Sequence, residues 1–250
     1  MKNSIYKRAI SIGTIMFALF LLIGCESQES SNLRTAGIYA NIDATANQYG
    51  VVDVNVQLTM GPLSNTVVDL SDGDTLSASA RGIQKLLQKN KTLLGDITYE
   101  TSISAGNDAG TKVQVMFDRR EGVSATNSYA YLPPPFNIEA PASGTSYSDT
   151  EQVSIVWNPE TNSRRSMTIS AINYCAGGES KISLPSVRDS SGIATFSASS
   201  LVPTNLAAGT VCDVRIVLSR VQSGVVDSNF DGGTFTIDQT RNVDIKVAIQ

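Results

Sequence analysis

Apolar and polar residues alternate along most of this chain, and period-two alternation is the pattern of β-strands with one buried face. In the clearest run, 52–60, valine, leucine and methionine occupy every second position, and Asp, Asn, Gln and Thr lie between them. Similar patterning recurs in later stretches: 97–103, 113–117, 153–157, 167–171, 195–199, 214–218 and 243–247. The pattern therefore predicts short strands through most of the chain.

Turn-forming residues separate these runs, for example Ser-Asp-Gly-Asp at 71–74 and Gly-Asn-Asp-Ala-Gly at 106–110. Short strands with turns about every 8 to 12 residues are typical of antiparallel sheets packed as a sandwich. The segment 82–94 differs, because Ile83, Leu86 and Leu87 have helical spacing. It is interpreted either as a short helix or as a connection packed across an open end of a sandwich.

A proline run divides the strand pattern into two halves of similar size. The segment Leu132-Pro133-Pro134-Pro135-Phe136 has an extended, semi-rigid backbone, and its prolines cannot donate to a β-ladder. A chain of this length allows two domains of the usual size. We therefore predict an all-β protein with two tandem antiparallel β-sandwich domains, 35–132 and 133–250.

The amino-terminal segment has the features of a secretory signal. Three basic residues precede an uncharged run over 10–24, which is shorter than the roughly 20 residues that a membrane-spanning helix needs. The run ends in Leu22-Ile23-Gly24-Cys25, which resembles the lipobox of bacterial lipoproteins. This resemblance implies a signal peptide over 1–24 and acylation of Cys25. Residues 26–32 are polar and Ser-rich, so we predict a lipidated, flexible tether over 25–34.

Acylation would determine where the mature protein resides. Each buried methylene group contributes about 0.8 kcal/mol, so one acyl chain binds a membrane marginally, whereas two or three anchor a protein stably. Glu26 follows the cysteine. In enterobacteria an aspartate at that position resembles an inner-membrane retention signal, so its absence favours the outer membrane. The alternative is a secreted protein in which Cys25 is incidental.

Composition restricts the classes of partner and of chemistry. Removal of 1–24 takes away three positive charges and no negative ones, which moves the formal net charge from −4 to −7. Because binding to a phosphate backbone relies on clustered Lys and Arg, nucleic acid is not expected as a partner. The chain also contains no histidine, which excludes Ser-His-Asp and Cys-His mechanisms, imidazole proton shuttles and most catalytic zinc sites.

Chemistry based on paired carboxylates is not excluded by composition. Five glutamates are available, but their spacing does not distinguish an acid from a base: Glu100, Glu139, Glu151, Glu160 and Glu179. The mature sequence has no glycine-rich phosphate loop and no Ser-x-x-Lys or Gly-x-Ser-x-Gly motif. We therefore predict that the protein is not an enzyme and has no catalytic residues.

Two cysteines in the second half are in phase with apolar positions. Cys175 continues the alternation of 167–171, and Cys212 precedes the alternation of 214–218, so both thiols should face a core. In an oxidising compartment this pair predicts a disulfide, which would close a loop of about 37 residues. Two buried free thiols that act as small apolar side chains are the alternative.

A set of motifs extends from the linker to the carboxyl end: Leu132-Pro133, Phe136-Asn137-Ile138, Pro141, Trp157-Asn158-Pro159, Cys175, the Asp189 to Gly192 turn, Cys212, Arg220, Gly232-Gly233 and Gln239-Thr240-Arg241. With these motifs the chain resembles a group of uncharacterised proteobacterial lipoproteins with tandem immunoglobulin-like sandwiches. The resemblance implies immunoglobulin-like domains and offers no established activity. True immunoglobulin domains have a tryptophan between their two cysteines, whereas Trp157 precedes both here.

One loop matches the skeleton of a calcium site. The segment Asp227-Ser228-Asn229-Phe230-Asp231-Gly232 has the D-x-[DN]-x-[DN]-G spacing, in which alternate oxygens converge on a hard cation. Asp238 takes the place of the usual final glutamate. The candidate ligands are therefore Asp227, Asn229, Asp231 and Asp238, and calcium is the only candidate cofactor. A plain turn is the alternative, because Asp, Asn and Gly form such turns without a metal.

Two further groups bear on possible partners. A basic stretch lies in the unusual segment: Arg81, Lys85, Lys89 and Lys91. It could meet anionic lipid near the anchor, or it could be a solvated face. Aromatic residues gather around the linker: Tyr129, Tyr131, Phe136 and Tyr147. They could stack on sugars, although we expect them to pack the two domains together.

These observations predict a lipid-anchored cell-envelope protein that acts as a non-enzymatic binding or structural module. Its expected partners are the lipid bilayer, through acylated Cys25, and an unknown envelope protein or glycan. Two alternatives remain open: a carbohydrate-active or other hydrolytic protein with paired carboxylates, and a calcium-dependent adhesion module.

Overall fold

The computed structural model describes residues 27–93, 95–161, 164–175 and 177–250. The predicted signal peptide and Cys25 lie outside the described residues. The described regular structure is almost entirely β-strand, with four short 3-10 turns: η2 (Ser30–Asn32), η3 (Thr35–Gly37), η4 (Asp189–Ser191) and η5 (Ala198–Leu201). None of the described helices has the length and hydropathy needed to cross a bilayer.

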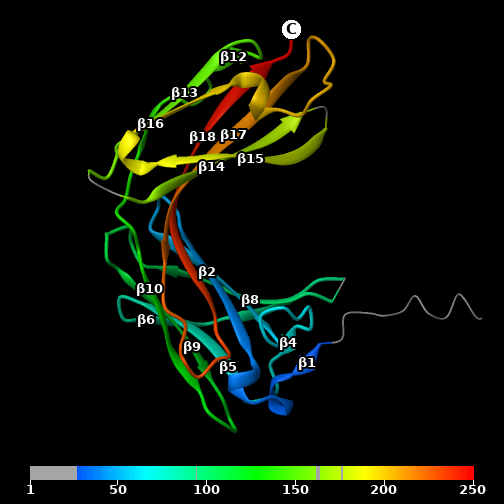
Figure 1. Ribbon diagram of the computed structural model, residues 1–250, viewed down its shortest axis with the longest axis vertical. Helices are drawn as coiled ribbons and strands as arrows, with labels where there is room; N and C mark the ends of the chain where they lie inside the picture. The colour runs from blue at the N-terminus through cyan, green and yellow to red at the C-terminus, as the bar shows by residue number, and fades with distance from the viewer. Residues whose placement is uncertain (1–26, 94, 162–163, 176) are drawn as a thin grey trace, which may run out of the picture.

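Two β-sandwiches are stacked along the long axis of the molecule (Figure 1). The strands of the first sandwich are β2 (Tyr39–Ala46), β3 (Val51–Thr59), β5 (Thr75–Ala80), β6 (Ile83–Leu86), β7 (Gln88–Lys91), β8 (Ile97–Ser104), β9 (Lys112–Asp118) and β10 (Ala125–Tyr131). A short parallel pair, β1 (Gln28–Glu29) and β4 (Val68–Asp69), lies beside them. One sheet has the order β10-β9-β5-β6, and the strands β2, β3, β8 and β7 form the other layer.

The second sandwich packs a three-stranded sheet against long antiparallel strands. Its strands are β11 (Ile138–Ala140), β12 (Ser146–Ser148), β13 (Gln152–Trp157), β14 (Ser166–Cys175), β15 (Gly178–Arg188), β16 (Ile193–Ser197), β17 (Val211–Ser223) and β18 (Gly233–Ala248). The small sheet has the order β11-β13-β16. The opposite layer is ordered β15-β14-β17-β18 and continues through β18 into β2 of the first sandwich, so that one nine-stranded sheet extends through both.

Inward-facing apolar side chains fill one core in each sandwich. The predicted alternation put the correct faces inward: Val54 and Val115 are buried in the first core, and Ile155 and Ile216 in the second. Met60 is an exception with 39% exposure, because β3 ends at Thr59. The predicted all-β fold of two tandem sandwiches is confirmed.

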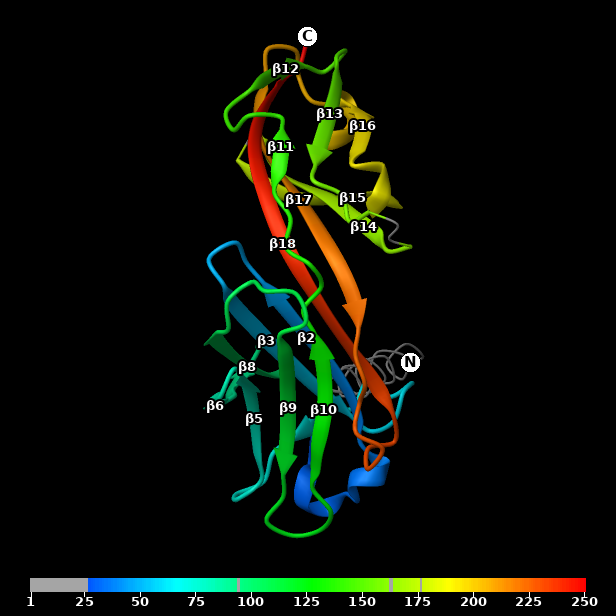
Figure 2. The same cartoon turned by 90° about the vertical axis from the view of Figure 1, so that its left-hand side faces the viewer.

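The strand β18 belongs to both sandwiches, and β17 runs beside it (Figure 2). β18 pairs in parallel with β2 over 233–239 and with β12 over 246–248, while β17 lies along its other edge. As a result, three residues of this hairpin lie in the first core: Phe230, Phe235 and Ile237. The second sandwich therefore differs from the contiguous segment 133–250 expected from the sequence, because the chain returns to the first sandwich after residue 223.

Gly224 marks the point where β17 ends and the chain meets β10. A Cβ atom at this position would lie 2.5 Å from the carbonyl oxygen of Tyr129 and 2.6 Å from the Cβ of Ala130. The next residue, Val225, exchanges two backbone hydrogen bonds of 2.8 Å with Tyr129. Glycine allows this close approach of two backbones, so the hairpin contacts both layers of the first sandwich.

The segment 82–94 contains two strands and not the helix that its spacing allowed. β6 pairs with β5 in the four-stranded sheet, and β7 pairs with β8 in the nine-stranded sheet. Leu87 lies between them and is buried, with its N–H donating to the Leu76 carbonyl at 2.9 Å. Ile83 and Leu86 remain 41% and 56% exposed. The chain changes sheets at Leu87, so no helical apolar stripe is buried.

Residues 28–37 pack against the first sandwich, which differs from the flexible tether expected over 25–34. β1 is held by β4, and the hydroxyl of buried Ser30 donates to Asp74 at 2.8 Å. The nearly buried guanidinium of Arg119 donates to the carbonyls of Ser30 at 2.6 Å and Leu33 at 2.8 Å. The Ser-rich composition did not reveal these contacts, because the donor lies almost 90 residues away in the sequence.

Tyr99 makes the first sandwich sensitive to alkaline pH. Its buried hydroxyl accepts from the Leu70 N–H at 2.8 Å, and burial raises the pKa of Tyr99 from 10.0 to about 12. Between these values the unfolded chain has lost a proton that the folded protein retains, so stability falls as pH rises through this window. Thermal melts followed by circular dichroism between about pH 9 and 12 should show this fall. Tyr99→Phe should reduce it, and an undiminished fall would contradict the assignment.

Candidate functional site

The junction between the sandwiches is a network of buried polar side chains that binds the linker backbone. Arg220 of β17 is 1% exposed and donates to the carbonyls of Pro134 at 2.9 Å, Pro135 at 3.1 Å and Asn158 at 3.1 Å. Gln239 of β18 donates at 2.7 Å to the Pro133 carbonyl. Prolines lack N–H groups, so the linker offers acceptors, and these two side chains supply the donors.

Asp189, in η4, carries the charge that balances Arg220. Its Oδ1 accepts from Arg220 Nη2 at 2.7 Å and from Trp157 Nε1 at 3.1 Å, and the residue is fully buried. A buried charge pair is tolerated when further hydrogen bonds satisfy its remaining groups. The carbonyls bound by Arg220 and the indole bound by Asp189 meet this condition in part, whereas Arg220 Nε and Asp189 Oδ2 are buried without a hydrogen-bond partner among the described residues.

Phe136 at the end of the linker lies against two guanidinium groups. The central carbon of Arg220 is 5.0 Å from the ring centroid, and that of Arg241 is 5.4 Å away, which are cation–π distances. Arg241 also donates to Gln239 Oε1 at 3.0 Å. Burial, followed by the nearby positive charge of Arg220, lowers the pKa of Arg241 below its ordinary value.

The position of this network follows from the phase of β18. Gln239 and Arg241 continue the inward-facing positions of the strand and are buried, between Ile237 in the first core and Val243 in the second. The sequence presented Arg220, Gln239 and Arg241 as motifs without a role. The structure brings them together with Asp189 as a clamp that fixes the orientation of the two sandwiches.

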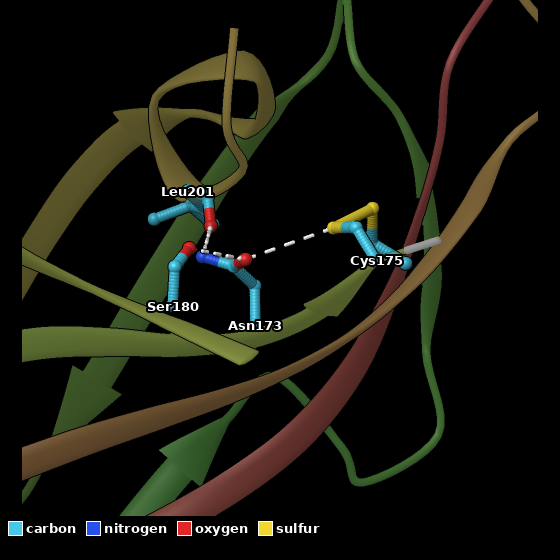
Figure 3. Close-up of a disulfide and its surroundings, with 5 residues drawn as sticks. Asn173, Cys175, Ser180 and Leu201 are labelled. Carbon is cyan, nitrogen blue, oxygen red and sulfur yellow. Dashed lines mark hydrogen bonds between the residues drawn. A yellow bond between two sulfur atoms is a disulfide. The ribbon is translucent and has the colours of Figure 1, made fainter. Parts of the chain in front are cut away.

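The predicted disulfide between Cys175 of β14 and Cys212 of β17 is confirmed, with sulfur atoms 2.07 Å apart in the second core. Buried Asn173 lies close to it (Figure 3). Its Oδ1 accepts from Ser180 Oγ at 2.8 Å, and its Nδ2 donates to the Leu201 carbonyl at 3.4 Å. Covalent and polar links thus join β14 to β15, β17 and η5.

The outer face of the larger sheet in the first sandwich carries carboxylates in two adjacent rows. Strand register places Asp238, Thr45, Asp53 and Ser102 in one row and Thr236, Asp43, Asn55 and Glu100 in the next. We call these eight residues the acidic face. None of them is basic, and diagonal neighbours on its antiparallel strands are about 7 to 8 Å apart. A hollow of about 490 Å³ lies over this face.

Hydrogen bonds orient the carboxylates of the acidic face. Ser102 Oγ donates to Asp53 at 2.5 Å, and Asn55 Nδ2 donates to Glu100 at 2.9 Å. Burial, followed by the charge of Asp238, raises the pKa of Asp43. The face consists mostly of hydrogen-bond acceptors, so it is complementary to N–H and O–H donors and to positive charge. The strand alternation placed Asp53 outward, but only strand pairing brings it near Asp43 and Glu100.

The four predicted calcium ligands do not converge in the structure. Asp227 accepts from the N–H groups of Asn229 at 2.9 Å and Asn127 at 2.8 Å, as a turn residue does. Asp231 lies in the same turn, whereas Asp238 is five residues beyond Gly233 on β18, which is about 17 Å along a strand. Within the described ranges, no three His, Cys, Asp or Glu side chains are placed to hold a metal ion.

The other groups singled out in the sequence do not form one site. Among the aromatic residues, Phe136 fills the expected role at the junction, while Tyr131 on β10 is 43% exposed. Three of the four basic residues bind protein groups: Arg81 pairs with Asp108, Lys89 pairs with Asp69, and Lys85 donates to the Ser102 carbonyl. Of the five candidate glutamates, only Glu100 belongs to the acidic face.

No protein-family model and no curated protein sequence matches the chain. Among solved structures, it is similar to the tandem Ig repeats of Dlar, with 12% identity, coverage of 85% of this chain and 97% of that chain, and a TM-score of 0.32. It is also similar to the N-terminal Ig1-2 module of the Drosophila receptor protein tyrosine phosphatase DLAR, with 10% identity, coverage of 85% of this chain and 99% of that chain, and a TM-score of 0.31. A third similar structure is that of the fibronectin(III)-like modules of Clostridium thermocellum CbhA, with 10% identity, coverage of 84% of this chain and 94% of that chain, and a TM-score of 0.24. Because these TM-scores are below 0.5, the fold description rests on the strands and cores of the chain itself.

Proposed function

We propose that this protein is a lipid-anchored component of the cell envelope that acts as a non-enzymatic binding or structural module. The observation that carries the proposal is the β17–β18 hairpin, whose inward side chains enter both cores. Because Arg220 and Gln239 of the same hairpin also bind the linker carbonyls, the two sandwiches form one stiff unit. Such a unit holds its binding surfaces at a fixed distance from the membrane.

The anchor is part of the proposal, and its support is the lipobox-like Leu22-Ile23-Gly24-Cys25 behind a charged and then apolar segment. Two or three acyl chains would hold the protein stably, and Glu26 favours the outer membrane. Release of Cys25→Ser from the membrane fraction is the expected result. Continued sedimentation of that variant with membranes would contradict the anchor.

We assign partner binding to the acidic face, because its carboxylates are exposed or half-buried and are oriented by neighbouring hydroxyl and amide groups. The partner would be an envelope protein with a basic patch or a glycan rich in hydroxyl donors. A variant that removes the negative charges but keeps the shapes of the side chains tests the surface without disturbing the fold. The variant Asp43→Asn/Asp53→Asn/Glu100→Gln does this, since each amide is nearly isosteric with its acid.

Crosslinking in intact cells followed by mass spectrometry tests the assignment. Wild-type protein should yield one defined partner, and the triple amide variant should lose it. A matched control, Glu139→Gln/Glu179→Gln, removes two exposed carboxylates from the second sandwich and should retain the partner. Equal recovery with all three proteins would refute the acidic face as the binding surface. Recovery of nothing above background with wild type would contradict a binding role.

The hollow over the acidic face also favours a second candidate, hydrolysis by paired carboxylates. Asp43 and Asp53 are diagonal neighbours on antiparallel strands, with backbones about 7 to 8 Å apart, a spacing that lets their carboxyl groups adopt the separation that inverting glycosidases use. Hydrolysis predicts new reducing ends when the protein is incubated with envelope glycans, and it predicts their loss in Asp43→Asn. The absence of turnover with wild-type protein would remove this candidate.

A further inference from the structure

The direction of β1 determines where the amino-terminal chain leaves the first sandwich. β1 runs parallel to β4, with Gln28 opposite Val68, and the Gln28 N–H donates to the Val67 carbonyl at 2.9 Å. In a parallel pair, the residues before Gln28 lie beside the residues before Val68. The chain therefore leaves β1 at the end where the turn between β3 and β4 stands, and β1 and β4 lie together on one side of the sandwich (Figure 1).

That turn, 60–66, presents apolar side chains to solvent. Leu63 is 96% exposed and Met60 is 39% exposed, and the sequence Met-Gly-Pro-Leu-Ser-Asn-Thr carries no charge. The turn is closed at its base, because Thr59 bridges to Val67 and the Met60 N–H donates to the Thr66 carbonyl at 3.1 Å. Leu63 is thus held outward at the tip of a fixed hairpin.

We propose that the 60–66 turn is a second membrane contact, which inserts Leu63 into the interface of the bilayer that carries the lipid anchor. This inference rests on the proposed acylation of Cys25. Gln28 is the third residue after Cys25, and three extended residues span at most about 11 Å. Because Gln28 is fixed against β4, the acylated residue must lie within that distance of the end of β1 beside the turn.

The bilayer fits this turn better than another protein does. A single exposed leucine is common on protein surfaces and needs no partner. Leu63, however, lies in the turn next to which the proposed lipid anchor would enter the membrane. The polar headgroup region is only a few ångströms deep on each side, so a turn this close to the anchor reaches the interface. An uncharged turn enters the interface without the cost of removing a charge from water.

The test uses a fluorescent probe at the tip of the turn. In the lipidated protein Cys25 would be blocked and Cys175–Cys212 form a disulfide, so a cysteine introduced as Leu63→Cys is the only free thiol. An environment-sensitive dye on this thiol is measured in vesicles of phosphatidylethanolamine and phosphatidylglycerol with nitroxide-bearing lipids. Ile193→Cys, an exposed position at 49% in the second sandwich, carries the same dye as the matched control.

At position 63 the expected result is a blue-shifted emission that nitroxide lipids quench. At position 193 the dye should remain in water, and its emission should not be quenched. Equal, weak quenching at both positions, in protein that still floats with the vesicles, would overturn the membrane contact while leaving the anchor intact. Failure of the wild-type protein to float, or unchanged flotation of Cys25→Ser, would refute the anchor itself. The two failures are therefore distinguishable.

Discussion

Replacing Arg220 with leucine should lower the free energy of unfolding by about 3 to 5 kcal/mol, because it leaves the Asp189 carboxylate buried without its charged partner. The substitution also removes the donors that bind the linker carbonyls. Urea unfolding followed by far-UV circular dichroism measures the loss. Fluorescence of Trp157, the single tryptophan, reports on the second sandwich in the same experiment.

An ion pair on the same strand provides the control. Arg215 of β17 pairs with Asp244 at 2.8 Å, but both side chains are about half exposed, so Arg215→Leu should cost at most about 1 kcal/mol. The double variant Arg220→Leu/Asp189→Leu should recover much of the loss, since it removes the unpaired charge. If Arg220→Leu costs no more than Arg215→Leu, the clamp does not stabilise the junction.

Removal of the disulfide should have a comparable effect. The bond between Cys175 and Cys212 closes a loop with a sequence separation of 37 residues, and loop entropy predicts a contribution of roughly 4 kcal/mol. The double variant Cys175→Ala/Cys212→Ala frees β14 from β17 in the unfolded chain. Its urea midpoint, followed through Trp157 fluorescence, should shift to lower concentration by the corresponding amount.

Reduction supplies an independent check of this value. Wild-type protein in a thiol reductant should unfold like the double alanine variant, and the variant should not respond to the reductant. A response of the variant would mean that the reductant acts elsewhere. The disulfide of the wild-type protein could instead resist reduction while the protein is folded. If that protein were then no more stable than the variant, the bond would have no stabilising role.

Much of the strand content was predictable, because alternation is a local property. A residue such as Val54 or Ile216 faces the core in any sandwich that keeps its strand in phase. The in-phase positions of Cys175 and Cys212 predicted the disulfide for the same reason. Proline chemistry likewise located the linker, since prolines at 133–135 cannot join a ladder.

The local hydrophobic pattern did not predict the structure of a segment that contributes strands to two different sheets. In 82–94 the spacing of Ile83, Leu86 and Leu87 suited a helix, but the chain crosses from one sheet to the other at Leu87. Residues 28–34 appeared to be a tether because their composition is polar, yet Arg119 binds their carbonyls. In both cases the deciding partners are distant in sequence, so composition and period do not contain them.

The amino-acid sequence alone establishes which side chains face inward, where the chain can turn, which two thiols can pair, and that imidazole chemistry is impossible. Which strands become neighbours is visible only in the three-dimensional fold. Pairing of β18 with β2 joins residues almost 200 positions apart, which links both cores, buries the Arg220 clamp and assembles the acidic face. The physical reason is that alternation fixes the orientation of a side chain within its own strand, whereas strand order depends on which pairings bury the most apolar surface across the whole chain.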